Sequence, residues 1–449
     1  MLISFAIQNW MSFRDPAEFS LIASREQQHG RRLTRLNKFR MRALPIAAVY
    51  GGNASGKTNL FKALAFAKHF IVRGCQQDAM IPIETFELDK DFRSKPASFT
   101  FEILVNDDIY EFSFAVTASE VVEEKLIKIL STSEKVLYHR IMHDLNPRFH
   151  SSVRNQRLKF AFEGTRDNQL FLTNSVSQKI DTFKHVYDWF AKTLILVAPD
   201  ARFNAFEKFI SEDSPLYNRM NLILPKLDTG ITTLGGEEVS FDTLQIPDIL
   251  KQELREKTTD KTTIKLNERD EKLVVSRENG KLVVKKLYTY HQDAQGNKVR
   301  FEMKQESDGS KRIMDLLPAF LDLTANQSSS VYIIDELDRS LHTLLTKQLI
   351  SIYLGNCSSS TRNQMIFTTH DLMLMNQSLL RRDEMWITKR KNDGSSQLIS
   401  FAEFDDIRND KDIRKSYLQG RMGGIPDLTA DIIISDIARG LHSNGTEKI

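Results

Sequence analysis

Apolar and polar residues alternate with a period of two in several parts of the chain, which is the pattern of half-buried β-strands. Residues 3–7 show this alternation first. A longer stretch has apolar side chains at Phe99, Phe101, Ile103 and Val105 and, after a polar turn at 106–108, at Tyr110, Phe112, Phe114 and Val116. Two alternating runs separated by a short polar turn predict a β-hairpin. We therefore expect an antiparallel β layer in this part of the chain.

Other segments combine a short apolar run with apolar residues at helical spacing. The run 46–50 is typical of a buried strand, and it is followed at helical spacing by Leu60, Leu64, Ala67 and Ile71. The runs 331–334 and 364–369 predict two more buried strands. Between them, a helix is predicted by Leu341, Leu345, Leu349 and Ile352. Strands that alternate with helices indicate an α/β fold.

The chain has 449 residues, which is too long for one ordinary compact core, so we expect more than one lobe. We divide it into an N-terminal lobe (1–160), an inserted helical and β region (161–290) and a C-terminal lobe (291–449). Within the insertion, the apolar runs 273–275 and 282–284 flank Asn279-Gly280 and predict a second hairpin. No heptad pattern is sustained there, so a coiled-coil arm can only be a stub.

Composition excludes several classes of protein. Lys and Arg number 62 against 59 Asp and Glu, so no polyanionic partner is implied for the chain as a whole. The two cysteines, Cys75 and Cys357, lack metal-type spacing and suit a reducing compartment. No run approaches the roughly 18 apolar residues of a membrane span, and the first residues carry no cationic leader pattern. We therefore expect a soluble, cytoplasmic protein with no membrane partner.

Charge is nevertheless uneven along the chain. Residues 27–77 contain no Asp or Glu, and a basic cluster in this stretch comprises Arg31, Arg32, Arg35, Lys38, Arg40 and Arg42. Two interpretations are open. The cluster could bind phosphate, either of a nucleotide or of a nucleic acid. It could also be a solvated basic loop, which is the commoner outcome for a run of like charges.

The strongest chemical motif follows the predicted strand 46–50. It fits the phosphate-binding pattern G-x-x-x-x-G-K-[ST] with the residues Gly51, Gly52, Asn53, Ala54, Ser55, Gly56, Lys57 and Thr58. A glycine-rich loop before a helix N-terminus surrounds phosphate with backbone N–H groups and with the positive end of the helix dipole. Lys57 would reach the β- and γ-phosphates and Thr58 would bind Mg²⁺. We expect ATP and Mg²⁺ as cofactors.

Three further motifs follow in the C-terminal third. Ser307 and Gly309 form a Ser-x-Gly turn that opens a helix, which is a weak anion site when taken alone. The strand 331–334 ends in Asp335 and Glu336, which would hold Mg²⁺ and activate the attacking water respectively. His370 ends the strand 364–369 and could hydrogen-bond the γ-phosphate, although a lone histidine at a strand end is more often structural.

This order of motifs resembles the ATP-binding-cassette ATPases. Asn9-Trp10-Met11-Ser12-Phe13 and the Gly52-Asn53-x-Ser55-Gly56-Lys57-Thr58-Asn59 form of the loop resemble the SMC, RecF and OLD branch of these ATPases. The motifs at 334–338, 340–342, 368–371, 380–383 and 417–426 look like those of stand-alone ATPases from bacterial anti-phage defence operons, namely RloA-type proteins and the ATPase of PARIS-like systems.

The resemblance implies an α/β P-loop NTPase fold of the ABC (SMC/RecF-like) type, with an antiparallel β layer and a short helical insertion in place of a long coiled coil. It also implies a head that forms a homodimer or a higher homo-oligomer through its ATP sites, and a neighbouring gene that supplies a destructive effector, often a Toprim nuclease. The implied roles are phosphate and Mg²⁺ binding for residues 51–59, Mg²⁺ binding for Asp335 and general base for Glu336. Further implied roles are the switch histidine for His370, the D-loop acid for Asp338, and contact with ATP on the opposite subunit for Ser307 and Gly309.

The chain departs from the family pattern at two places. Glu306 and Asp308 stand where the Ser-x-Gly motif usually has a leucine and a second glycine, and no glutamine lies between Asp78 and His150, where the Q-loop is expected. The Q-loop residue is therefore unassigned. We expect slow ATP hydrolysis that depends on dimerisation.

Two functions remain open from the sequence. In the first, the protein is an ATP-gated sensor or scaffold that controls a nuclease or toxin effector in anti-phage defence. In the second, it is a RecF/SMC-like DNA-binding ATPase of repair or recombination, with the basic cluster on the duplex. The chain is not expected to be a nuclease itself, because 79 residues after His370 are too few for a Toprim domain. We interpret the acidic residues Asp405, Asp406, Asp410 and Asp412 as a solvated loop.

Overall fold

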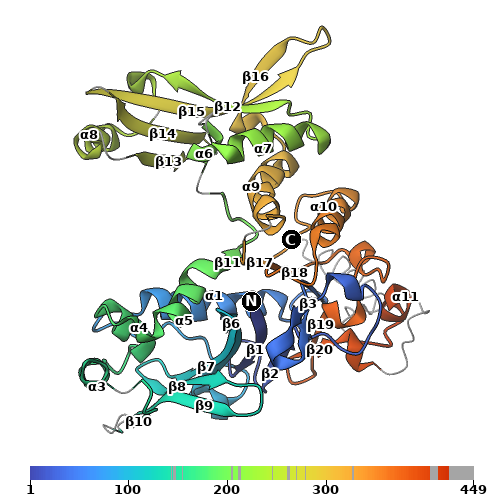
Figure 1. Ribbon diagram of the computed structural model, residues 1–449. Helices are drawn as coiled ribbons and strands as arrows, with labels where there is room; N and C mark the ends of the chain where they lie inside the picture. Colours follow the sequence, from blue (N-terminus) through green and yellow to red (C-terminus); the bar gives the residue numbers. More distant parts are fainter. Residues whose placement is uncertain are drawn as a thin grey trace, which may run out of the picture.

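The computed structural model describes residues 1–142, 144, 148–153, 155–203, 206–210, 214–244, 246–259, 263–268, 271–278, 280–325, 328–404 and 413–423. A larger body contains two large sheets and one two-stranded sheet, and a smaller lobe with a five-stranded sheet stands apart from it (Figure 1). The acidic residues expected in a solvated loop, 405–412, lie outside the described residues. Among the described helices, none is both long and apolar enough to cross a bilayer.

The central sheet of the body has six strands in the order β11-β17-β18-β5-β19-β20. The strands are β11 (Leu194–Val197), β17 (Val331–Ile334), β18 (Gln364–Thr368), β5 (Ile46–Tyr50), β19 (Met385–Arg390) and β20 (Ser396–Ser400). All neighbours are parallel except β20, which pairs antiparallel with β19. Every residue of β5, β17 and β18 is buried, as the continuous apolar runs of β5 and β17 predicted.

Helices cover both faces of the central sheet. Ala47 and Val49 of β5 pack with α1 (Lys57–Arg73) in one core, and Ile46 and Ala48 pack with α9 (Asp308–Leu323) and α10 (Thr343–Asn356) in the other. Successive residues of a strand point to opposite faces, so one apolar strand contributes to both cores. The P-loop follows β5 and the Asp-Glu motif follows β17. Both motifs therefore begin at strands that are fixed between two packed layers.

The second sheet of the body is the expected antiparallel layer. Its seven strands follow the order β10-β9-β8-β7-β6-β1-β2. They are β1 (Leu2–Gln8), β2 (Ala17–Ser20), β6 (Ala97–Val105), β7 (Asp108–Val116), β8 (Val121–Ile129), β9 (Glu134–Ile141) and β10 (Arg148–Phe149). The predicted hairpin is β6–β7, and its turn residues Asn106 and Asp107 have φ of 50° and 60°. Positive φ at both central residues is the geometry of a tight hairpin turn.

The smaller lobe holds a five-stranded antiparallel sheet with short helices. Its elements are α6 (Glu207–Ile210), α7 (Pro215–Ile223), β12 (Thr233–Val239), α8 (Asp248–Lys257), β13 (Ile264–Glu268), β14 (Glu271–Glu278), β15 (Lys281–Gln292) and β16 (Lys298–Glu302). The β14–β15 hairpin confirms the second predicted hairpin, although Asn279 of its turn lies outside the described residues. The longest described helix here is α8 with 10 residues, so a coiled-coil arm is not part of the described lobe. The expected helical insertion therefore consists largely of β structure.

The structure divides the chain differently from the boundaries at 161 and 290. The helices α3 (Gln156–Glu163), α4 (Phe171–Ser177) and α5 (Lys184–Asp188), with the π-helical turn Trp189–Thr193, contribute to the core between α1 and the antiparallel sheet. β11 then pairs with β17 in the central sheet. The chain thus leaves the body only after Val197 and returns at α9. The remaining elements are β3 (Thr34–Leu36), β4 (Met41–Ala43), α2 (Lys90–Arg93) and α11 (Ile413–Leu418).

Candidate functional site

The P-loop connects the carboxyl end of β5 to the first turn of α1 and packs tightly against β19 and β20. Gly51 has φ of 151°, and a Cβ at this position would lie 2.4 Å from the Thr388 hydroxyl oxygen and 2.6 Å from the Thr388 carbonyl oxygen. Gly56 has φ of 115°, and its Cβ would lie 2.5 Å from the Ser396 hydroxyl oxygen. Both positions therefore require glycine for backbone conformation and for space.

Hydrogen bonds from distant segments hold this loop in place. The Ser55 hydroxyl bonds to the Thr388 hydroxyl at 2.6 Å, and the Ser396 hydroxyl donates to the Ser55 carbonyl at 2.7 Å. The Ser396 hydroxyl also lies in hydrogen-bond contact with the Ser12 hydroxyl at 2.8 Å, and the Ser12 hydroxyl accepts from the Asn59 amide at 2.7 Å. The N-terminal Asn-Trp-Met-Ser-Phe motif thus braces the P-loop. Sequence reasoning missed Ser12, Thr388 and Ser396 as supports, because they lie far from the loop along the chain.

Lys57 lies beneath the loop with its side chain largely buried. Its ammonium donates to the carbonyls of Gly51 at 2.8 Å and Gly52 at 3.0 Å. Burial lowers the pKa of Lys57 to about 8, against the opposing effect of the carboxylates of Asp335, Glu336 and Asp338. By contrast, Asn53, Ala54 and Thr58 are exposed at the mouth of the loop. The ammonium is therefore close to the three carboxylates, and the Thr58 hydroxyl is accessible to a ligand.

The lowered pKa of Lys57 makes phosphate affinity dependent on pH. Only the ammonium form attracts a triphosphate, and a bound triphosphate raises the pKa of the lysine in the complex. ATP affinity should thus be constant below pH 8 and should fall by up to about tenfold per unit above it. Titration of a fluorescent ATP analogue from neutral pH upward measures this. Lys57→Arg, which stays charged, should give a flat profile; a flat profile for the unmodified protein would contradict the assignment.

Asp335 follows β17 and is fully buried beside β18. One carboxylate oxygen accepts from the Thr368 hydroxyl at 2.5 Å, and the other is buried without a partner among the described residues. A buried carboxylate oxygen without a partner is costly, and a cation or its bound water would satisfy it. No group of three or more His, Cys, Asp or Glu forms a closed metal site in the described chain. A single carboxylate with one unpaired oxygen fits Mg²⁺, which completes its shell with water and substrate phosphates.

Glu336 adopts a left-handed backbone conformation with φ of 49°. Its N–H donates to the Thr368 hydroxyl at 2.8 Å, so Thr368 fixes both carboxylate residues. Arg312 of α9 reaches the carbonyls of Asp335 and Glu336, each at 3.4 Å. The Glu336 side chain keeps 35% exposure, with Arg339 at 3.9 Å. Its carboxylate is therefore open to solvent while its backbone is held in a strained conformation.

His370 and Asp338 complete the cluster. The backbone N–H of His370 donates to one Asp338 carboxylate oxygen at 3.4 Å, and the other oxygen of Asp338 is buried without a partner among the described residues. Burial and the Lys57 charge lower the pKa of His370, and the carboxylates of Asp338, Glu336 and Asp335 oppose this shift. His370 is therefore neutral at pH 7 and can donate or accept one hydrogen bond. The structure brings Lys57, Asp335, Glu336, Asp338 and His370 together.

The Ser-x-Gly turn lies at the N-terminus of α9. The Ser307 hydroxyl caps the helix by accepting from the Ser310 N–H at 3.0 Å. A Cβ at Gly309 would lie 2.8 Å from the Ser340 carbonyl oxygen, so glycine is required where the turn meets the segment after Asp338. Ser307 is exposed, and in the described chain no hydrogen bond or ion pair joins Ser307 or Gly309 to residues 51–59.

The unusual Glu306 of this motif has a structural role. It is buried, and one of its carboxylate oxygens accepts from the Thr289 hydroxyl and bonds to His291 Nε2 at 2.7 Å. Thr289 and His291 lie on β15 of the smaller lobe. A buried carboxylate needs such partners. Glu306, which stands where the motif usually has a leucine, therefore joins the Ser-x-Gly turn to the smaller lobe.

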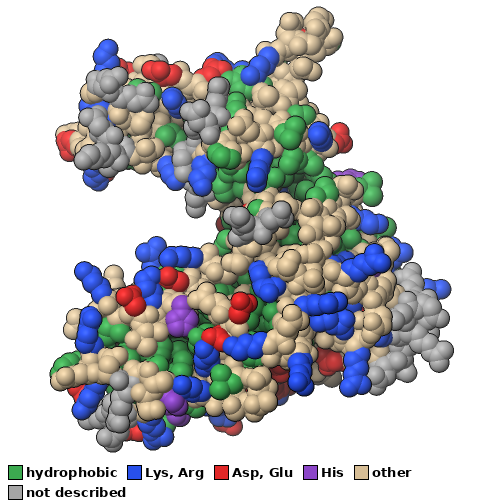
Figure 2. Space-filling view, in the orientation of Figure 1, with side chains coloured by type: hydrophobic (Ala, Val, Ile, Leu, Met, Phe, Trp, Pro, Cys, Tyr) green, Lys and Arg blue, Asp and Glu red, His purple; other side chains and the backbone are tan. Residues whose placement is uncertain are grey.

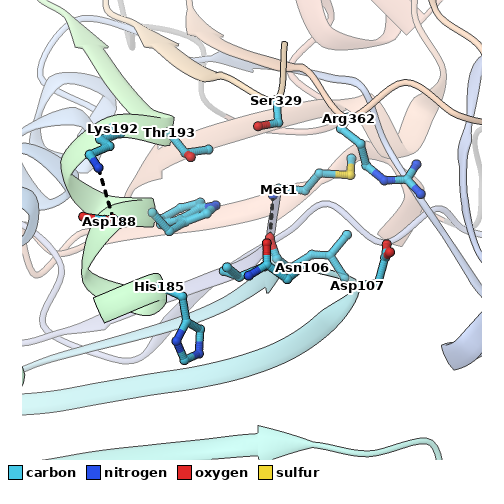
Figure 3. Close-up of a pocket in the computed structure, with 12 residues that line it drawn as sticks. Met1, Asn106, Asp107, His185, Asp188, Lys192, Thr193, Ser329 and Arg362 are labelled. Carbon is cyan, nitrogen blue, oxygen red and sulfur yellow. Dashed lines mark hydrogen bonds and ion pairs between the residues drawn. The ribbon is translucent and has the colours of Figure 1, made fainter. Parts of the chain in front are cut away.

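A cavity of about 430 Å³ lies at the opposite edge of the central sheet (Figure 3). It is lined in part by the β6–β7 turn, the π-helical turn, and Ser329 and Arg362, which come just before β17 and β18. The P-loop and Asp335 lie at the carboxyl ends of these parallel strands, and the cavity lies at their amino ends. Ligands of such sheets bind at the carboxyl ends, so this cavity is separate from the candidate nucleotide site.

Comparison with known proteins identifies the family of this arrangement. A family model described as "AAA domain, putative AbiEii toxin, Type IV TA system" matches residues 46–376, nearly three quarters of the chain. The solved "SMC head domain from Thermotoga maritima" is similar with a TM-score of 0.35 and 14% identity, over 89% of this chain and 98% of that one. "Crystal structure of the SmcHead bound to the C-winged helix domain of ScpA" is similar with a TM-score of 0.38 and 12% identity, over 89% and 97%. No curated protein matches the chain.

Proposed function

Because the chain belongs to this AAA domain family, we propose that it hydrolyses ATP slowly as a dimer and uses the ATP state to control a partner. The observation that carries the proposal is the convergence of four residues on Lys57 of the P-loop: Asp335, Glu336, Asp338 and His370. Two carboxylate oxygens of this cluster are buried without partners among the described residues. Such atoms suit a site that is completed by a cation, water or nucleotide.

Each residue of the cluster has a role in this proposal. The backbone of residues 51–58 and the Lys57 ammonium hold the phosphates, and Asn59 braces the loop through Ser12. Thr58 and Asp335 would hold Mg²⁺, which neutralises charge on the β- and γ-phosphates. Glu336 accepts a proton from the attacking water, since its carboxylate is accessible. Neutral His370 positions the γ-phosphate through a hydrogen bond.

The site would be completed by Ser307 and Gly309 of a second copy. Support comes from the exposure of Ser307 and from the contact between Gly309 and the Ser340 carbonyl, which places the Ser-x-Gly turn beside the Asp338 segment. A γ-phosphate bound by one copy would accept hydrogen bonds from the helix N-terminus of the other. Hydrolysis would then depend on dimerisation, and the ATP state would set the assembly state.

A dimerisation experiment tests this function directly. With ATP and Mg²⁺, the Glu336→Gln protein should elute as a dimer in size-exclusion chromatography with light scattering. Adding Lys57→Ala to this protein should give a monomer without bound ATP, because the substitution removes the ammonium group that binds the phosphates. Adding Ser307→Asp should keep ATP binding but prevent dimerisation, because aspartate preserves the helix cap and repels phosphate. Ser307→Asn is the matched neutral control. A dimer of the Ser307→Asp protein would overturn the role of this residue across the interface.

The partner in this proposal is an effector from a neighbouring gene, a nuclease or toxin of cytoplasmic anti-phage defence. The family description, which refers to a toxin, supports this class of function. The smaller lobe would supply the docking surface, since its exposed apolar side chains include Leu222, Ile249 and Val299. The destructive activity would belong to the partner and not to this chain. Affinity purification from the native gene neighbourhood should recover a stoichiometric effector; its absence would contradict the proposal.

A second candidate is a RecF/SMC-like DNA-binding ATPase of repair or recombination. It is favoured by the exposed arginines upstream of β5, namely Arg31, Arg35 and Arg40. Recovery of DNA without a protein partner in the same purification would support this candidate over the first.

A further inference from the structure

The structure separates the six residues of the basic cluster into two groups. Arg32 is buried, donates to the Leu379 carbonyl at 2.9 Å and pairs with Glu384. Arg32 is therefore a structural residue. For this residue, both interpretations of the basic cluster, a phosphate-binding surface and a solvated loop, are wrong. Lys38 is exposed but pairs with Asp108. Arg31, Arg35 and Arg40 are exposed, and Arg42 is partly exposed.

These four arginines lie on one antiparallel pair, β3 and β4, and its flanks, which we call the arginine hairpin (residues 31–42). Arg35 lies directly opposite Arg42 in the register. A Cβ at Gly30 would be 3.9 Å from the Arg42 guanidinium, so the backbone just before Arg31 lies beside Arg42. Like charges opposite each other destabilise a strand pair. Figure 2 shows Lys and Arg side chains gathered on the flank of the body where Figure 1 places β3 and α10.

In the part of the chain that the structure describes, no carboxylate offsets this charge. Among the described residues, Arg31, Arg35, Arg40 and Arg42 have no Asp or Glu within ion-pair distance. The acidic residues of the neighbourhood already have cationic partners: Asp108 pairs with Lys38 and Lys128, Glu384 with Arg32, and Asp383 with Arg381. Within the described chain, the arginine hairpin therefore presents a positive surface without paired carboxylates, which suits an external polyanion.

The arginine hairpin and the P-loop lie at opposite ends of β5, so the hairpin is not part of the candidate nucleotide site. It enters β5 at the amino end of that strand, whereas the P-loop leaves the carboxyl end. The Arg35 N–H donates to the Ser359 carbonyl at 2.9 Å, and Thr34 donates to the Thr361 carbonyl, so the hairpin lies on the loop before β18. This loop is likewise at the amino end of its strand. The phosphate that the hairpin would bind is therefore not that of ATP in the P-loop of the same chain.

We propose that the arginine hairpin binds the phosphate backbone of double-stranded nucleic acid without reading sequence. Guanidinium groups bind phosphate oxygens in a bidentate manner. The exposed Ser358, Ser359 and Ser360 beside the hairpin add hydroxyl donors. Phe39, the aromatic residue of the hairpin, is half-buried with the Lys38 ammonium 5.5 Å from its ring. The surface thus lacks the exposed aromatic rings on which single-stranded bases stack.

Fluorescence anisotropy with a labelled duplex of about 20 base pairs tests this surface, with no nucleotide added. Four phosphate contacts predict that log K falls with log salt at a slope of about −3 to −4 between about 50 and 200 mM. Charge reversal at Arg31, Arg35 and Arg40 should weaken binding at least about 100-fold and should reduce the slope by about 3. Because the assay contains no ATP, its outcome is independent of the ATPase proposal.

The matched control reverses three exposed charges elsewhere, at Arg73, Arg219 and Lys281 on α1, α7 and β15. It makes the same change in net charge and should retain the slope and most of the affinity. Equal losses in both variants, or no binding of DNA or RNA duplex by the unmodified protein, would overturn the proposal. If the unmodified protein binds neither duplex, an acidic protein would be the expected ligand of this surface. Stronger binding of a single strand than of the duplex would overturn the duplex assignment.

Discussion

The Glu336→Gln protein is expected to hydrolyse ATP about 10²–10⁴-fold more slowly than the unmodified protein while binding ATP with similar affinity. The amide has nearly the shape of the carboxylate but cannot accept the proton of the attacking water. The backbone should keep its place, because it is held by the Thr368 hydroxyl and by Arg312 and not by the Glu336 side chain. The change therefore removes a proton acceptor from an otherwise intact site.

Phosphate release under single-turnover conditions measures this prediction, and a fluorescent ATP analogue measures binding in parallel. Glu238→Gln is a suitable control, because Glu238 is an exposed carboxylate on β12 of the smaller lobe. It should leave both quantities unchanged. A normal rate for Glu336→Gln would mean that another group takes the proton, and Asp335 and His370 would be the next residues to test.

Much of the body could be predicted from the sequence because its signals are local. The continuous apolar runs of β5 and β17 identify buried strands, the apolar centre of β18 identifies a third strand, and the β6–β7 alternation identifies a hairpin. The residues at the carboxyl ends of parallel strands meet at one edge of a sheet. The order of motifs therefore predicted that Lys57, Asp335, Glu336 and His370 would come together, as they do.

The parts that could not be predicted depend on contacts between distant residues. Nothing near Ser55 indicates that Thr388 and Ser396 hold it, more than 300 positions away. Arg32 resembles its neighbours in sequence, yet it is buried because Glu384 and the Leu379 carbonyl lie opposite it. Frequent lysines and glutamates weaken the alternation within β12–β16, so only the β14–β15 hairpin of this sheet was predicted and the other strands were not. Local pattern identifies elements, and tertiary contacts decide burial.

A second large effect is expected at Arg381, which is fully buried. Its Nε and Nη2 donate to the Asp383 carboxylate at 2.8 and 2.6 Å, and its Nη1 donates to the Glu26 carbonyl at 3.0 Å and to the Gln28 carbonyl. Arg381 thereby joins the segment before β3 to the segment before β19. Arg381→Ala removes the cation and leaves a buried carboxylate and two buried carbonyls without it. We expect the free energy of unfolding to fall by about 3–5 kcal/mol.

A double-mutant cycle in urea distinguishes the loss of this ion pair from the loss of packing. Arg381→Met combined with Asp383→Leu removes both charges, so it should be more stable than the sum of the single changes predicts. The recovery should be partial, because Asp383 also accepts from the Ser24 N–H at 2.7 Å and because the Glu26 carbonyl stays unpaired. Arg73→Ala, at an exposed arginine, should change stability by less than about 0.5 kcal/mol. Strict additivity in the cycle would show that Arg381 stabilises the body through its backbone contacts alone.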